Sequence, residues 1–526
     1  MKSIVSSADN IKFKPNKWLV GASVMIGAFM GVMDVSVVNV ALPHMMGSFG
    51  QNLSAITWIA TSYSIAAVIM MTMSGWWSTL MGRKNFYLIC FVIFTVGSIL
   101  AGMSHTFQQM IICRILQGMG GGSLVPLAQA ILRESFPKKE QGMAMAIFSM
   151  GVVAAPAIGP VLGGWLTDNY GWAWIFYINI PVSLVGMMMV GAFVHDPPYL
   201  RRGVKKIDIV GILLLTAGLT GLQVFLERGQ EQNWFDSSMI VWTAIFTVVS
   251  LLSLVFWELS VSEPVVNLRI FKNMQFRMGA VVVILFGVAL YGTTFILPQF
   301  TQQLLNYPAY QAGLVLMPRA VALMCVLPLV GQLYNYADPR GLMIFGIAVV
   351  CVSYFQLAHL ATTAAQGNII PILLLMGTGM PFIFVTLSTV SLSSMEKENM
   401  TSASGLFNLF QQVGGNVGYA VMATLLDRNT QIHHSYLSEH ISQFNLNFVH
   451  FYRQTVGFMF HHGMTLGAAR VATMATVNNL VTQQAAMMAY NDISIFLMIM
   501  FLVCVPFVLL IPVQKGRFDS PVAVEM

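Results

Sequence analysis

The chain has 526 residues, of which 56% are hydrophobic and only 9% are charged. A soluble protein carries about 25% charged residues, because its folded surface must stay hydrated. The 26 Lys and Arg and 20 Asp and Glu residues are too few for a cytosolic enzyme, a nucleic-acid-binding protein or a disordered chain. The composition therefore predicts an all-α integral membrane protein.

Fourteen stretches are long and apolar enough to cross the hydrocarbon core as helices, which takes about 20 mostly apolar residues each. A strand barrel would show short alternating segments instead, so the pattern predicts helices. In chain order, the stretches are Trp18–Leu42, Ala55–Trp77, Phe86–Met103, Met110–Leu132, Met143–Leu166, Trp174–Val194, Ile209–Leu226, Met239–Trp257, Met278–Phe300, Ala312–Tyr334, Leu342–Leu360, Ile369–Leu392, Ser404–Leu426 and Ile493–Val513.

The basic residues divide unevenly between the two sides of the predicted membrane. With a cytoplasmic N-terminus and alternating connections, 20 of the 26 Lys and Arg residues lie on the cytoplasmic side and four on the outer side. Because cytoplasmic loops carry the excess of Lys and Arg, residues 1–17 and 514–526 are both expected in the cytoplasm. The net charge of +6 is thus a topological signal, and no nucleic-acid partner is expected.

The spans suggest a duplicated arrangement of six, two and six helices. Gly159 and Gly163 in the fifth span are echoed by Gly414 and Gly418 in the thirteenth, which holds the same place in the last six spans. Six-helix halves around a midplane site are a transporter architecture. We expect a first bundle over residues 18–194, two additional helices with linkers over 195–277, and a second bundle over 278–513.

Asp34 is the only acidic residue deep in a predicted span. A charged residue at the centre of a membrane helix costs about 2.5–3.5 kcal/mol on insertion scales, and such residues are functional by default. Arg114, in the fourth span, is the natural counter-charge because its guanidinium stays ionised. We predict that Asp34 carries the coupled proton and that Arg114 makes its ionised form tolerable. A purely structural pair is the alternative.

Small residues mark three further segments. Glycines let helices approach closely, and prolines bend or loosen a helix. The glycines from Gly118 to Gly122 are therefore expected at a tight helix contact. A conformational role is predicted for Gly159, Pro160, Gly163 and Gly164, with generic packing as the alternative. A cytoplasmic loop motif, or a simple positive-inside anchor, is expected at Gly75, Gly82, Arg83 and Lys84.

Residues 427–492 form a predicted outer loop that contains six of the ten histidines. They lack acidic or Cys ligands at tight spacing, so we predict a solvated or partner-binding segment and no metal site. The stretch Thr465–Tyr490 has few charges and is expected to form a helix that rests on another surface. That surface is either the outer mouth of the protein or a periplasmic adaptor.

Several motifs, taken in order, resemble the fourteen-helix drug:proton antiporter family of the major facilitator superfamily, and most closely its EmrB-type multidrug exporters. The resemblance covers nearly the whole chain. Its motifs are Asp34–Pro43 (DVSVVNVALP), Arg114–Gly122 (RILQGMGGG), Ala155–Gly164 (APAIGPVLGG), Trp172–Pro181 (WAWIFYINIP), and Glu227–Gly229 with Trp234.

The resemblance implies a proton-coupled exporter of lipophilic drugs or toxic compounds in the bacterial inner membrane. It also implies partners: protons, membrane lipids, small lipophilic substrates, a periplasmic adaptor and an outer-membrane channel. No cofactor is expected, because the proton gradient supplies the energy. By the same resemblance, a substrate cavity is expected to be lined by Asn39, Gln117, Tyr291, Gln299, Asn408 and Gln411.

The sequence departs from the family pattern in the cytoplasmic loop and in two other motifs. Thr79 and Leu80 stand where relatives carry an Asp-Arg pair. The resemblance implies that this Asp holds a cytoplasmic gate closed, so the gate in this chain lacks its usual residue. Gln411 stands where many relatives carry Arg, and Ala173 where a central Arg is common.

Other functions are weighed against the drug exporter. A narrow-substrate exporter of fatty acids, bile salts or siderophores has the same fold. An intramembrane enzyme lacks its catalytic motifs here, and an ATP-driven pump would need a phosphate-binding loop that the sequence does not contain. A mostly apolar cavity with one buried acid favours lipophilic weak acids, neutral compounds or monovalent cations.

Overall fold

The computed structural model describes residues 16–196, 207–362, 364–442 and 444–512. The cytoplasmic tail predicted at 514–526, and nearly all of the N-terminal segment 1–17, lie outside the described residues. The chain forms two compact units. Unit 1 comprises residues 1–223, 245–273 and 392–409, and unit 2 comprises residues 224–244, 274–391 and 410–526.

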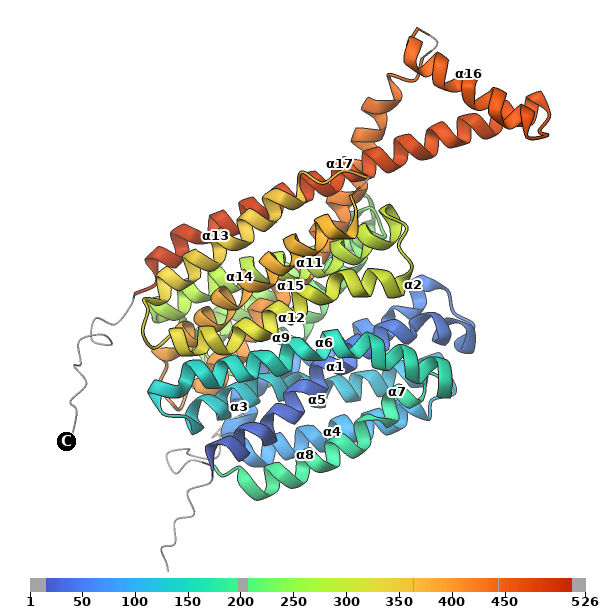
Figure 1. Cartoon of the computed structure of the whole chain (residues 1–526). Helices are drawn as coiled ribbons and strands as arrows, with labels where there is room; N and C mark the ends of the chain where they lie inside the picture. The colour runs from blue at the N-terminus through green and yellow to red at the C-terminus, as the bar shows by residue number, and fades with distance from the viewer. Residues whose placement is uncertain (1–15, 197–206, 363, 443, 513–526) are drawn as a thin grey trace, which may run out of the picture. The chain divides into compact units, whose positions relative to one another are not determined.

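Unit 1 is a bundle of long helices joined by short turns (Figure 1). In it α5 packs against α3 and α4, and α1 packs against α5 and α6. Its elements are α1 (Lys17–Phe49), α2 (Leu53–Ile56), α3 (Trp58–Met81), α4 (Arg83–Gly102), α5 (Phe107–Ser135), η1 (Lys138–Glu140), α6 (Gln141–Tyr170), α7 (Trp174–Tyr177), α8 (Asn179–Phe193) and η3 (Leu268–Lys272).

Unit 2 is also helical, and within it α17 packs against α11 and α13. Four helices contribute residues to both units: α9 (Ile209–Arg228), α10 (Ser238–Ser260), α14 (Gln366–Ser393) and α15 (Met400–Ser438). The other elements are η2 (Trp234–Asp236), α11 (Met274–Gln299), the π-helix η4 (Phe300–Leu304), α12 (Ala309–Leu333), α13 (Pro339–Leu357), α16 (Leu446–His461) and α17 (Leu466–Leu510).

The predicted spans agree with the helices of the structure. Each of the fourteen stretches overlaps a helix, and among the described residues thirteen helices are long and apolar enough to cross a membrane. The exception is α15, which overlaps the stretch Ser404–Leu426 but also carries polar residues such as Asn408, Gln412 and Asn416. The chain is therefore a multi-pass, all-α membrane protein.

Residues 427–492 are almost entirely helical, which corrects the prediction of a long loop. Helix α15 continues to Ser438, α16 follows, and α17 runs without a break from Leu466 to Leu510. The helix expected at Thr465–Tyr490 thus merges with the last span, because no glycine or proline separates Tyr490 from the start of that span at Ile493. Thr465 caps the start of α17 by accepting a hydrogen bond from the Ala468 N–H.

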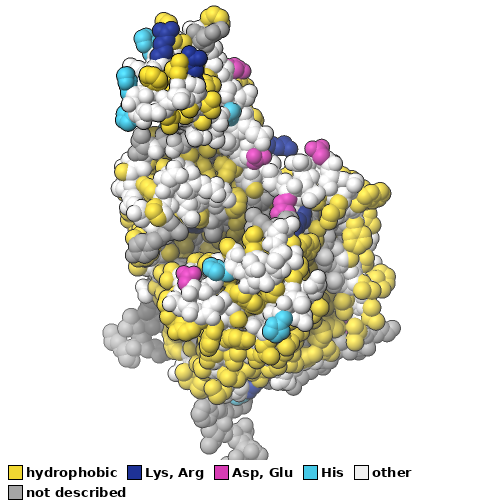
Figure 2. All heavy atoms as spheres, turned by 90° about the vertical axis from the view of Figure 1, so that its right-hand side faces the viewer, with side chains coloured by type: hydrophobic (Ala, Val, Ile, Leu, Met, Phe, Trp, Pro, Cys, Tyr) yellow, Lys and Arg dark blue, Asp and Glu magenta, His cyan; other side chains and the backbone are white. Residues whose placement is uncertain are grey.

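We call residues 433–475 the arm, which projects from the rest of unit 2 (Figure 1). Phe444, Leu446 and Val471 on the arm are 88%, 74% and 72% exposed. Figure 2 shows hydrophobic and histidine side chains together on this projection. The arm helices therefore present an apolar surface, and α17 packs against α16.

Candidate proton-coupling site

Asp34 lies on α1 in the middle of unit 1 and is only 2% exposed. One carboxylate oxygen accepts a hydrogen bond from Arg114 Nη1 at 2.6 Å. The other accepts from Gln117 Nε2 at 2.8 Å and from the Asn179 side-chain amide at 3.1 Å. The four side chains come from three helices, α1, α5 and α8, and form a closed polar cluster.

Arg114 is fully buried, and besides Asp34 its Nη1 donates to Gln117 Oε1 at 2.6 Å. Its Nε donates to the Ile59 carbonyl at 3.1 Å, and the guanidinium carbon lies 4.3 Å from the centre of the Tyr63 ring. Such cation–π contacts stabilise a desolvated guanidinium. Within the described residues, Arg114 Nη2 has no hydrogen-bond partner. The cation is thus held mainly by Asp34, and loss of that carboxylate would leave it poorly compensated.

Local packing explains why these residues meet. Gln117 follows Arg114 by three residues, so both side chains project from the same face of α5. Gly97 on α4 lets that helix approach closely, since a Cβ there would lie only 2.6 Å from the Gln117 backbone nitrogen. The next residue, Ser98, accepts hydrogen bonds from Gln117 and from Asn179. Ser98 thereby fixes the side-chain amides of Gln117 and Asn179, which hold Asp34.

Sequence reasoning missed Asn179, Ser98 and Tyr63 as parts of this cluster. Asn179 is the polar residue within the otherwise apolar segment Ile175–Pro181, and that isolation was the available signal. Ser98 and Tyr63 carry no such signal, because single hydroxyls are common in membrane helices. Gln117, expected to line a substrate cavity, is fully buried beside Asp34 in this structure.

The arrangement can hold or release one proton at the Asp34 carboxyl. With Asp34 ionised, the carboxylate is paired with Arg114 and accepts two further hydrogen bonds from amides, which offsets the cost of burying its charge. With Asp34 protonated, the ion pair is lost, and the guanidinium keeps only neutral acceptors such as Gln117 Oε1 and the Ile59 carbonyl. Protonation and the packing of α1, α5 and α8 are therefore energetically linked.

The predicted glycine contacts lie around this cluster. A Cβ at Gly118 would lie 2.5 Å from the Tyr63 carbonyl oxygen, and one at Gly120 would lie 2.5 Å from that of Cys90. In α6, Gly159 and Gly163 face α1 at Ser36 and Val37. Gly164 has only ordinary contact distance to Val40, and Pro160 lies within the continuous helix α6. Close approach of α1 and α6 thus depends on Gly159 and Gly163.

The cytoplasmic loop motif forms a second polar cluster in unit 1. Arg83 is only 2% exposed, pairs with Glu134 and donates to the Lys397 carbonyl at 2.8 Å. The backbone N–H of Lys84 donates to Asp196 at 2.8 Å. Gly82 adopts a φ of 86°, which favours glycine, and a Cβ at Gly75 would collide with Ser402. Arg83 is therefore a buried structural partner as well as a basic loop residue.

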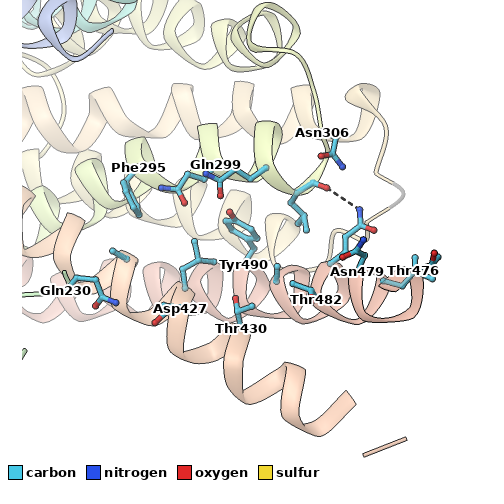
Figure 3. Close-up of a pocket in the computed structure, with 17 residues that line it drawn as sticks. Gln230, Phe295, Gln299, Asn306, Asp427, Thr430, Thr476, Asn479, Thr482 and Tyr490 are labelled. Carbon is cyan, nitrogen blue, oxygen red and sulfur yellow. Dashed lines mark hydrogen bonds between the residues drawn. The ribbon is translucent and has the colours of Figure 1, made fainter. Parts of the chain in front are cut away.

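The other residues expected at a substrate cavity are not gathered in one place within either unit. Asn39 is exposed on α1, and Asn408 is buried and donates to Gln129 Oε1 at 2.7 Å. In unit 2, the Tyr291 hydroxyl lies 3.4 Å from Gln412 Oε1 and Gln411 is half-buried. Gln299 lines a pocket of about 950 Å³ (Figure 3).

Comparisons with known proteins agree with this architecture. The Major Facilitator Superfamily family model matches residues 24–419. The chain is similar in fold to the crystal structure of the human organic anion transporter MFSD10, with a TM-score of 0.60 and 12% identity over 93% of this chain and 100% of that one. A XylE mutant structure gives a TM-score of 0.62 and 14% identity over 95% and 97%.

The chain belongs to the major facilitator superfamily, and it is a membrane transporter rather than an enzyme. It is 32% identical to the multidrug export protein EmrB of Haemophilus influenzae, over 90% of this chain and 92% of that protein. It is 31% identical to the fatty acid resistance protein FarB of Neisseria gonorrhoeae, over 95% and 96%. It is thus an exporter-type member related to EmrB and FarB.

Proposed function

We propose that the protein is a proton-coupled exporter of lipophilic drugs or toxic compounds in a bacterial inner membrane. The observation that carries the proposal is the buried cluster in which Asp34 is held by Arg114 and two amides. The relationship to EmrB, a protein named for multidrug export, supports the substrate class. Both termini are placed in the cytoplasm, on the strength of the Lys and Arg distribution.

The proposed cycle alternates the protonation state of Asp34. In the inward-facing state, protonated Asp34 releases its proton as substrate binds, and Arg114 then pairs with the carboxylate. In the outward-facing state, a proton from outside neutralises Asp34 and substrate leaves. Because the ion pair links α1 to α5, its loss alters the packing of α1, including the contact with α6 that Gly159 and Gly163 allow.

A narrow-substrate exporter is the second candidate, and one finding favours it. FarB, named for fatty acid resistance, is as similar to this chain as EmrB is. Identity alone therefore does not separate a broad drug exporter from a fatty-acid exporter. The substrates themselves must be compared.

A susceptibility panel in an efflux-deficient bacterial host tests the function directly. We expect expression of the chain to raise the inhibitory concentration of several chemically unrelated lipophilic drugs, and a protonophore to remove the accumulation difference. Protection against long-chain fatty acids alone would replace the drug exporter by the narrow-substrate candidate. Export that persists after collapse of the proton gradient would contradict proton coupling.

We also propose that the arm docks a periplasmic adaptor, which in turn meets an outer-membrane channel. The exposed apolar side chains of the arm support this assignment, because exposed apolar patches mark interaction surfaces. The arm also projects beyond the packed helices of unit 2 (Figure 1). A lid over the exit path is the alternative role.

Replacement of residues 440–472 by a Gly/Ser segment of equal length separates these roles. This design spares Gln483, whose side chain donates to the Leu304 carbonyl at 3.2 Å and ties α17 to η4. We expect the variant to lose co-purification with a co-expressed adaptor and to keep proton-driven transport in liposomes. A variant with Ser at Phe444, Leu446 and Val471 keeps the helices and should show the same loss. Transport that fails in liposomes while the fold is intact would establish the lid.

A further inference from the structure

Unit 2 contains a pocket of about 950 Å³ at its arm end, which lies outside if both termini are cytoplasmic. Drug-sized ligands occupy pockets of about 300–1,000 Å³. Its walls come from α11, η4, α15 and α17, with Gln230 from the turn that follows α9. Figure 3 shows Phe295 and Gln299 on one side and Tyr490 on the other, directed toward the same space.

The pocket is lined by side-chain amides and by the aromatic rings of Phe295 and Tyr490. Within the described residues, the side chains of Gln299, Gln303 and Asn479 have no hydrogen-bond partner and are available to a ligand. The Tyr490 ring is held edge-on by Phe300, with ring centres 5.4 Å apart. Amides recognise both donors and acceptors, while the rings of Phe295 and Tyr490 attract flat apolar groups and cations.

The backbone around the pocket is locally irregular. Helix α11 contains Pro298 and passes into the π-helix η4, whose last residue, Leu304, lines the pocket. Asn306 then adopts a φ of 55°, a left-handed conformation that is uncommon outside glycine. π-Helical turns and strained residues cluster at functional sites. The hydrogen bond from Gln483 to the Leu304 carbonyl fixes this irregular segment against α17.

The charge of the pocket lining favours one sign of ligand charge. Asp427 is the one charged residue among the described residues that line the pocket, and no Lys, Arg or His is among them. Its carboxylate is exposed and accepts one hydrogen bond, from Gln431 at 3.1 Å. Arg428 follows in the chain but does not line the pocket. A carboxylate ligand would meet repulsion here with no cation to compensate it.

We propose that this pocket is an outer binding site for neutral or singly cationic amphiphiles that carry an aromatic or apolar body and hydrogen-bonding groups. The site rests on the proposed export function, for which it would hold substrate on the exit side. It disfavours carboxylates such as free fatty acids, so it favours a drug exporter over a fatty-acid exporter. Gln299 belongs to this outer site, and Asp427 selects the charge of the ligand.

Binding of ethidium, an aromatic cation with amine donors, tests the site without any transport step. The full-length protein is placed in phosphatidylcholine nanodiscs, and ethidium fluorescence anisotropy is titrated. Ala486→Trp fills the pocket, and Asp427→Asn removes its charge. Ala475→Trp on the same helix and Asp236→Asn on an exposed turn are matched controls, because neither residue lines the pocket.

We expect Ala486→Trp to lower the affinity for ethidium by about tenfold or more, the equivalent of about 1.4 kcal/mol. Asp427→Asn should lower it about threefold, as exposed charge pairs are weak. The controls should bind like wild type, and excess laurate should not displace ethidium. Ethidium binding needs no proton movement, so a failure of proton coupling leaves this result unaffected.

Three results would overturn the proposal: no binding of ethidium, binding unchanged by both pocket variants, or displacement by laurate with tighter laurate binding in Asp427→Asn. Because Asp427 is exposed, its isosteric replacement should not disturb folding. That variant decides the question even if Ala486→Trp fails to fold. Ethidium binding at this pocket together with absent export would instead contradict the transport function and leave the site in place.

Discussion

Replacement of Asp34 by Asn is expected to abolish proton-coupled export while the chain still inserts into the membrane. Asn has the shape of Asp and still accepts a hydrogen bond, but its side-chain amide cannot bind and release a proton at physiological pH. It also leaves the Arg114 guanidinium without its counter-ion. In liposomes with an imposed pH gradient, drug-driven proton movement should fall to the level of protein-free vesicles.

Stability must be separated from mechanism in this experiment. Removing one partner of a buried ion pair costs about 3–5 kcal/mol, because the remaining charge is uncompensated. The double variant Asp34→Asn/Arg114→Gln removes both charges, so it should fold better than Asp34→Asn and remain inactive. Asp34→Glu keeps a titratable group and should retain part of the activity. Full proton-driven export by a well-expressed Asp34→Asn protein would show that Asp34 is only structural.

Gly122→Val is expected to prevent correct folding of unit 1. A Cβ at Gly122 would lie 2.5 Å from the Ala67 Cα and even closer to the Ala67 carbonyl oxygen. These are backbone atoms, so no side-chain rotation relieves the clash, and α5 must move away from α3. Overpacking costs about 1–3 kcal/mol in soluble cores, and a backbone clash should reach at least the upper end of that range.

The measurement is the yield of monodisperse protein after detergent extraction and the midpoint of its thermal unfolding. Gly191→Val, on α8 in the same unit, is the matched control, since nothing lies within 4 Å of a Cβ there. The control should behave like wild type. Equal stability of the two variants would show that the contact between α3 and α5 is looser than the structure indicates.

The cluster around Asp34 illustrates how far sequence reasoning reaches. A single acid deep in one apolar span and an arginine deep in another lower their desolvation costs by meeting each other, so their pairing was predictable. The structure shows that pair at 2.6 Å. The isolated Asn179 signalled a buried role but not its partner, and Ser98 gave no signal, because a neutral amide or hydroxyl in a membrane helix finds many alternative partners.

The shape of the arm and the position of the outer pocket, in contrast, could not be predicted from the sequence. The sequence indicated helix at Thr465–Tyr490 but not that it continues into the last span, because turn-forming residues mark boundaries and their absence is a weak signal. Gln299 and Tyr490 are almost 200 positions apart in the chain, and only the packing of α11 against α17 brings them to one pocket.

The sequence by itself therefore determined the class of protein, its membrane spans and the buried charge pair. These follow from composition, hydropathy and the cost of isolated charge, which depend little on long-range packing. Tertiary structure alone decided which neutral polar residues hold Asp34, how the arm is built, and where unit 2 forms a pocket. Those features depend on which helix faces meet, and many faces of apolar helices are nearly equivalent in sequence.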